Sequence, residues 1–212
     1  DGWAAAREID ASGLVAAPGF IDVHTHDDRL LLADPTMAPK ASQGVTTVIT
    51  GNCGISLAPW IAPAGGTVPP PLDLIGGAAD YRFATFGAYL ASLDAAPAAL
   101  NAACLVGHTT LRVAHMARLD RPADAGERRA MAAVVENALA AGAIGLSSGT
   151  FYPPARAAPE EELIAVGAPL ARAGGVFVTH MRDETQAVLD SIGETARIGR
   201  ALGVPAIISH HK

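Results

Sequence analysis

Two histidines separated by a single residue, His24 and His26, are the first side chains in this sequence that could do chemistry. They follow the apolar run Gly19-Phe20-Ile21 and Val23, which predicts a buried strand that ends at the pair. Successive side chains of a strand point to opposite faces, so His24 and His26 point the same way. Imidazole nitrogen is a common metal ligand, and the pair could therefore bind one metal ion.

Polar or reactive side chains also stand at the ends of five later stretches that are short and apolar. With the first stretch, they predict six strands at about residues 19–23, 45–50, 102–108, 143–148, 176–180 and 206–212, the third continuing into 109–112. The side chains at their ends are His24 and His26, Cys53, His108, Ser147 and Ser148, His180, and His210 and His211. Each predicted strand therefore ends in a group that could take part in a site.

Helical patterns separate most of these strands. Asp124 with Glu127 predicts a capping box for a helix that runs to about residue 141, and Pro159 with three following glutamates predicts another helix start. Apolar strands that alternate with helices predict a parallel sheet with covered faces. Polar or reactive side chains lie at every predicted strand end, and no Gly-rich phosphate loop follows the first strand. The pattern therefore favours an α/β fold of the (β/α)8 TIM-barrel type, with about six strands present.

The chain divides into two expected parts. Residues 1–17 predict two short strands around a turn at Ser12-Gly13, the tail of a small β domain, and residues 18–212 predict the partial barrel. Residues 55–85 are rich in Gly and Pro and too long for an ordinary connection, which favours a functional loop such as a lid. The start at Asp1 and the stop at Lys212 favour a fragment of a longer protein.

Composition excludes several classes of function. Half of the 212 residues are hydrophobic, enough for a substantial core, and the net charge of −6 offers no electrostatic footprint for nucleic acid or an anionic membrane. Apolar runs fall short of the roughly 20 residues that a membrane helix needs. Two cysteines, Cys53 and Cys104, are too few for a disulfide framework and favour a reducing, cytoplasmic location. Cys104 lies mid-strand and is expected in the core.

Several motifs in this order resemble one family. The opening from Asp10 to His26 resembles the amidohydrolase superfamily, metal-dependent hydrolases with a barrel beside a small β-sandwich. More narrowly, the chain resembles the N-acyl-D-amino-acid deacylases, or D-aminoacylases. The motifs that carry this resemblance are Gly51-Asn52-Cys53-Gly54, Gly107-His108-Thr109-Thr110-Leu111-Arg112, Gly145-Leu146-Ser147-Ser148-Gly149-Thr150-Phe151-Tyr152-Pro153-Pro154, Thr179-His180-Met181-Arg182-Asp183-Glu184 and Ile208-Ser209-His210-His211-Lys212.

The resemblance implies a zinc site. Cys53, His180 and His210 would hold a tightly bound zinc, and His24 with His26 would face a second, weaker position. Many relatives carry a carbamylated lysine on the fourth strand, which this sequence lacks between residues 143 and 148, and Cys53 would take its bridging role. Strand alternation lets only one of His210 and His211 face inward, and the resemblance selects His210.

The implied activity is zinc-dependent hydrolysis of N-acyl-D-amino acids to a carboxylate and a free D-amino acid. Metal-bound hydroxide would be the nucleophile. The family's catalytic aspartate belongs to the eighth strand, beyond Lys212, so no catalytic residue is expected within the chain. The alternatives are a cyclic-amide hydrolase of the dihydroorotase or hydantoinase kind, which the absent lysine disfavours, and an inactive metal-binding partial barrel.

Other side chains near the expected site have open roles. Lys212 could pair with the α-carboxylate of a small-molecule substrate, and Tyr152 could donate to its carbonyl or carboxylate. His108 is either a neighbour of the metal ligands or a hydrogen-bonded strand-end histidine. Residues 182–184 either orient His180 or begin the next helix. Asp22 shares the face of His24 and is left unassigned.

Overall fold

A six-stranded parallel sheet organises the chain in the computed structural model, which describes residues 5–210. The strands follow one another across the sheet in the order β1-β2-β5-β6-β7-β8, each parallel to its neighbours. Their bounds are β1 Phe20–Asp22, β2 Val45–Thr50, β5 Asn101–Gly107, β6 Gly145–Gly149, β7 Val176–His180 and β8 Ala206–Ile208. The six predicted strands and their parallel arrangement are confirmed, and all six C-terminal ends lie at one edge of the sheet.

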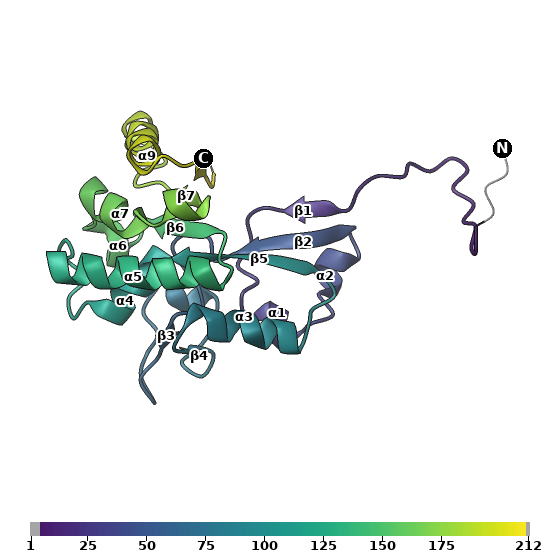
Figure 1. Cartoon of the computed structure of the whole chain (residues 1–212), viewed down its shortest axis with the longest axis horizontal. Coiled ribbons are helices and arrows are strands. Elements are labelled where there is room, and N and C mark those ends of the chain that lie inside the picture. The colour runs from purple at the N-terminus through teal and green to yellow at the C-terminus, as the bar shows by residue number, and fades with distance from the viewer. Residues whose placement is uncertain (1–4, 211–212) are drawn as a thin grey trace.

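Helices connect these strands and cover the sheet (Figure 1). They are α1 Leu30–Ala33, α2 Ala38–Ala41, α3 Phe86–Ala95, α4 His108–His115, α5 Ala125–Ala141, α6 Pro153–Arg156, α7 Glu160–Gly167, α8 Leu170–Ala173 and α9 Val188–Leu202. The capping box predicted for α5 is present, with Asp124 and Glu127 each accepting from the other's backbone N–H. Pro159 is the N-cap of α7, as the sequence predicts.

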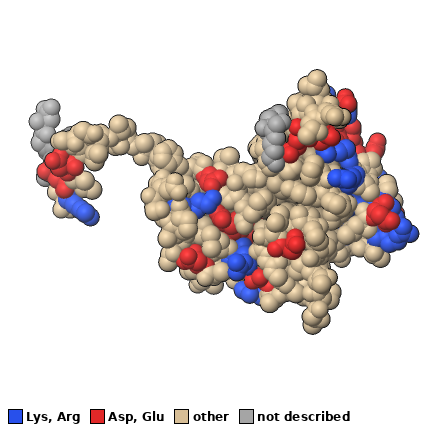
Figure 2. Space-filling view, turned by 180° about the vertical axis from the view of Figure 1, so that it is seen from behind, with Lys and Arg blue, Asp and Glu red and all other residues tan. Residues whose placement is uncertain are grey.

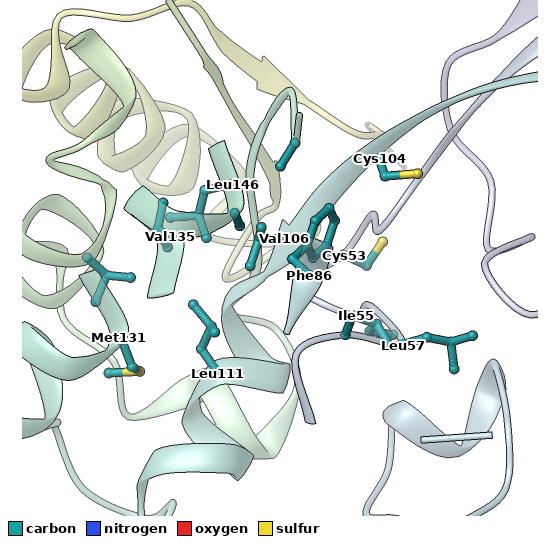
Figure 3. Close-up of a cluster of buried hydrophobic side chains, with 14 of the residues drawn as sticks. Cys53, Ile55, Leu57, Phe86, Cys104, Val106, Leu111, Met131, Val135 and Leu146 are labelled. Atoms are coloured by element: carbon teal, nitrogen blue, oxygen red, sulfur yellow. The ribbon is translucent and has the colours of Figure 1, made fainter. Parts of the chain in front are cut away.

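The main core lies between the sheet and its helices. Figure 3 shows Met131 and Val135 of α5 near Leu111 of α4, Val106 of β5 and Leu146 of β6, all buried in one hydrophobic cluster. Cys104 of β5 is buried in the same cluster, which confirms its expected core position. Burial of these side chains is the principal force that fixes the strand ends relative to one another.

The prediction of a fully buried first strand is wrong. Phe20, Ile21 and Val23 are 63%, 60% and 65% exposed. They are exposed because β1 is an edge strand that pairs only with β2 in the part of the chain that the structure describes. At the opposite edge, Ile207 of β8 is also half exposed.

Two local expectations are corrected as well. Residues 109–112 continue as helix α4 rather than as a strand, since the backbone turns at Gly107 and Thr110 donates its N–H to the Gly54 carbonyl. In residues 5–17 the turn at Ser12-Gly13 is present, but the two predicted short strands do not form, because no described segment pairs with them. This arm extends away from the sheet (Figure 1).

The long segment 55–85 is a packed part of the fold rather than an open loop. It contains the short antiparallel strands β3 Trp60–Ile61 and β4 Arg82–Phe83 and a 3-10 turn at Leu72–Leu74. Ile55, Leu72 and Tyr81 are buried in the main core, and Tyr81 donates to the Leu72 carbonyl at 2.6 Å. Its many core contacts do not support the role of a mobile lid.

Charged side chains of both signs are mixed over the face shown in Figure 2. Among the helices that the structure describes, none combines the length and the apolar character needed to cross a membrane.

Candidate metal centre

Four side chains from four strand ends converge at the C-terminal edge of the sheet. Cys53 Sγ lies 3.4 Å from His24 Nε2 and 3.5 Å from His180 Nδ1. His210 Nε2 lies 2.7 Å from the same nitrogen of His180. The parallel sheet brings these groups together because His24, Cys53, His180 and His210 all stand at or just beyond strand C-termini.

The loop that carries Cys53 is held in an unusual conformation. Cys53 has a φ of 55°, in the left-handed region that non-glycine residues seldom occupy. Asn52 Nδ2 donates to the Ile49 carbonyl at 2.9 Å, and Gly54 N donates to Ser147 Oγ at 3.0 Å. Ser147 Oγ in turn donates to the Gly51 carbonyl, so both ends of the loop are fixed to β6. A left-handed conformation costs a non-glycine residue free energy, and such strained residues are common at functional sites.

The donor set fits a transition-metal ion such as zinc. Zinc binds thiolate and imidazole at about 2.0–2.3 Å, so two ligands of a tetrahedral site lie roughly 3.3–3.8 Å apart. The two distances from Cys53 fall in this range. The ligand atoms of His24, Cys53 and His210 lie within 4.8 Å of one another, as do those of His180, Glu184 and His210. These side chains could hold a metal with soft and borderline ligands.

His26 lies beside this cluster. Its ring packs edge-on against His24 at a centroid distance of 5.5 Å, and it belongs to neither ligand group found among the described residues. Its Nδ1 atom is buried with no hydrogen-bond partner in the part of the chain that the structure describes. The predicted pair is therefore adjacent, but only His24 contacts Cys53.

Burial keeps the histidines in the form that binds metal. Burial, together with repulsion from His26 and His210, lowers the pKa of His24 to about 4. Burial also lowers the pKa of His26. Both imidazoles are consequently neutral at pH 7 and offer a nitrogen lone pair, as a metal ligand must.

Tyr152 contacts His180 through both its hydroxyl and its ring. Its hydroxyl lies 3.4 Å from His180 Nδ1, and the two ring centroids are 4.9 Å apart. Phe151 also packs against His180, at a centroid distance of 5.3 Å. Burial and the negative charges of Cys53 and Glu184 raise the pKa of Tyr152, so its hydroxyl is a donor at neutral pH. Lys212 and His211 lie outside the described residues.

Two open roles from the sequence are resolved as structural. His108 begins α4 and its Nε2 lies 3.1 Å from Glu162 Oε1, in a buried network with Arg112. Asp22 forms an ion pair with Lys40, whose Nζ also lies 3.3 Å from Asp27.

Glu184 is the site residue that the sequence leaves most open. It precedes α9, which begins at Val188, so it does not start that helix. Its Oε1 atom lies 3.5 Å from His180 Nε2 and 3.7 Å from His210 Nε2. The spacing of four residues after His180 was the available signal. The neighbouring Arg182 instead pairs with Glu194, and Asp183 accepts from Thr185 N and Ala187 N.

Comparison with known proteins decides the family. A model of the amidohydrolase family matches residues 7–204. The chain belongs to this family. It is 56% identical over 209 residues to a D-aminoacylase of Alcaligenes xylosoxydans xylosoxydans, covering 99% of this chain and 43% of that protein. It is 55% identical to an N-acyl-D-aspartate deacylase of the same organism, covering 96% of this chain and 41% of the relative. The chain thus spans about two fifths of the length of these relatives.

Solved structures agree with this assignment. The crystal structure of a D-aminoacylase is similar with a TM-score of 0.88 and 58% identity, over 92% of this chain and 40% of that one. An N-acyl-D-glutamate deacylase from Bordetella bronchiseptica, in complex with zinc and a phosphonate inhibitor that mimics the tetrahedral intermediate, is similar with a TM-score of 0.84 and 41% identity, over the same shares. The likeness confirms the predicted fold, of which this amidohydrolase chain supplies six strands.

Proposed function

We propose that the protein containing this chain hydrolyses the amide bond of N-acyl-D-amino acids, with zinc as its metal. The observation that carries the proposal is the approach of Cys53 Sγ to His24 Nε2 and His180 Nδ1 at 3.4 and 3.5 Å, with His210 beside them. The relatives support it, because one is a D-aminoacylase and another a zinc-containing deacylase. Both act on linear amides by name, which gives the cyclic-amide alternative no support.

Each residue has a proposed role. Cys53, His180 and His210 hold the tightly bound metal, while His24 and His26 face a second, weaker position. When bound, the metal polarises the amide carbonyl and lowers the pKa of a water molecule to about 7. The Tyr152 hydroxyl donates a hydrogen bond to the carbonyl or carboxylate of the substrate, and Lys212 attracts the substrate's α-carboxylate. The aspartate predicted beyond Lys212 accepts and returns the proton. We assign residues 18–212 to a partial catalytic barrel and residues 1–17 to the remnant of a small β-sandwich domain.

Cysteine substitution in the whole protein tests this proposal. Cys53→Ala removes the only thiol in the candidate centre among the described residues, so we expect loss of bound zinc and of turnover. Cys104→Ala is the matched control: Cys104 is buried within β5, and burial raises the pKa of its thiol to about 12. A protonated thiol does not ligate zinc.

Metal content and turnover of N-acetyl-D-methionine are measured on both variants and on the wild type. The unaltered protein is expected to release the D-amino acid and to leave the L enantiomer intact. A wild-type protein that contains no zinc and releases no D-amino acid from several acyl substrates would contradict the proposal. Equal loss of zinc from both cysteine variants would refute the ligand role of Cys53.

A further inference from the structure

The carboxyl group of Glu184 lies buried between the two histidines of the candidate tight site. The side chain is only 7% exposed, although it comes from the connection between β7 and α9. Its Oε1 atom faces His180 Nε2 at 3.5 Å and His210 Nε2 at 3.7 Å. Carboxylates are seldom buried unless they are paired with a hydrogen-bond donor, a cation or a metal ion, because removal of their charge from water is costly.

The two nitrogens of His180 have different surroundings. Nδ1 faces Cys53 Sγ at 3.5 Å and the Tyr152 hydroxyl at 3.4 Å, whereas Nε2 faces Glu184. Tyr152 and Phe151 pack against the ring, so it is held from the side as well. The imidazole thus stands between the candidate metal position and a buried carboxylate.

We propose that Glu184 is a positioning residue that accepts the Nε2–H of His180 and so directs the lone pair of Nδ1 toward the metal. This inference rests on the metal site proposed above. A neutral imidazole carries one N–H, and a carboxylate beside one nitrogen selects the tautomer with the proton there. The other nitrogen becomes a more basic and better oriented ligand.

Zinc affinity of the whole protein tests the inference without reference to turnover. We expect Glu184→Ala to weaken zinc binding about 10- to 100-fold in competition with a chromogenic chelator. Glu184→Gln keeps a carbonyl acceptor and should lose less. Glu161→Gln is the matched control, since it removes the same charge at an exposed position of α7. Wild-type affinity in Glu184→Ala would overturn the inference.

The tautomer of His180 gives a second readout that needs no variant. In nitrogen-15 spectra of the wild-type zinc protein, His180 is expected to carry its proton on Nε2 and its metal on Nδ1. A proton on Nδ1 would refute the role of Glu184 even if the variants fail to fold. A wild-type protein that binds no zinc would instead refute the proposed function, so the two failures are distinguishable.

Discussion

Glu162 is the centre of a buried ion-pair network whose removal has a calculable cost. Its carboxylate accepts from Arg112 Nη1, from His108 Nε2 at 3.1 Å and from Ala123 N at 2.7 Å. The side chains of Glu162, Arg112 and His108 are fully buried. Arg112 also donates to the Pro154 carbonyl at 2.7 Å, two residues after Tyr152. We expect Glu162→Gln to destabilise the protein strongly.

The magnitude follows from the pKa of Glu162. Burial alone would raise it, but the hydrogen bonds from His108, Ala123 and Arg112 lower it to about 2, against an ordinary 4.5. At about 1.4 kcal/mol per pKa unit, the ionised form contributes roughly 3 kcal/mol to the free energy of unfolding at pH 7. Leaving the buried charge of Arg112 without its partner costs about 3–5 kcal/mol, which agrees.

Glu160→Gln on the same helix is the matched control. Glu160 pairs with Arg197, but the two side chains are 28% and 54% exposed, and such pairs contribute about 0–1 kcal/mol. Urea unfolding at pH 7 of the wild type and both variants gives the two costs. If Glu162→Gln costs no more than Glu160→Gln, the reasoning from burial is refuted. Because the Glu162 pKa is lowered, the difference should shrink as the pH falls from about 4.5 toward 2.

Two further predictions concern the candidate centre. The pKa of His24 is lowered from 6.5 to about 4, so the metal-free protein takes up this proton only on unfolding, and its stability should fall as the pH drops from 6.5 to 4. His24→Gln should reduce that slope by at most about 1.4 kcal/mol per pH unit, less with solvent screening, and an unchanged slope in urea unfolding would contradict it. Gly51→Ala should destabilise more than Gly65→Ala in thermal unfolding. Both glycines have positive φ. A Cβ added at Gly51 would lie 2.0 Å from the Leu105 carbonyl oxygen, whereas a Cβ added at Gly65 would have no described heavy atom within 4 Å. Equal costs would show that the close approach is relieved without strain.

Periodicity and caps account for what the sequence predicts well. The six strands are short apolar runs bounded by glycines and prolines, and each helix start at Asp124 and Pro159 depends on residues adjacent in the chain. Such local patterns predict the elements well because they do not depend on distant parts of the chain. The exposure of Phe20 and Ile21 could not be predicted in this way, because it depends on whether β1 has one neighbouring strand or two.

Residues 108–112 show why tertiary contacts override a local pattern. Their two threonines and leucine resemble a strand, yet they form α4 because Thr110 bonds to Ser56 and Arg112 reaches Glu162 on another helix. Neither partner is visible in a local window. The role of Glu184 was open for the same reason, since its distances to His180 and His210 are set by two different strands.

Cys53 links the histidine pair His24 and His26, which first suggests a metal site, to the other candidate ligands. His24 contacts the Cys53 thiol from one side, and His180 contacts the same thiol from the other side. The thiol is therefore shared between the two sides of the candidate centre. A small residue at the end of β6 makes its position possible, because a Cβ at Gly149 would stand 2.1 Å from the Cys53 carbonyl oxygen. The Ser147 hydroxyl bonds both ends of the same loop. The small and polar residues that end β6 are therefore requirements of the cysteine's position, and larger side chains there should displace Cys53.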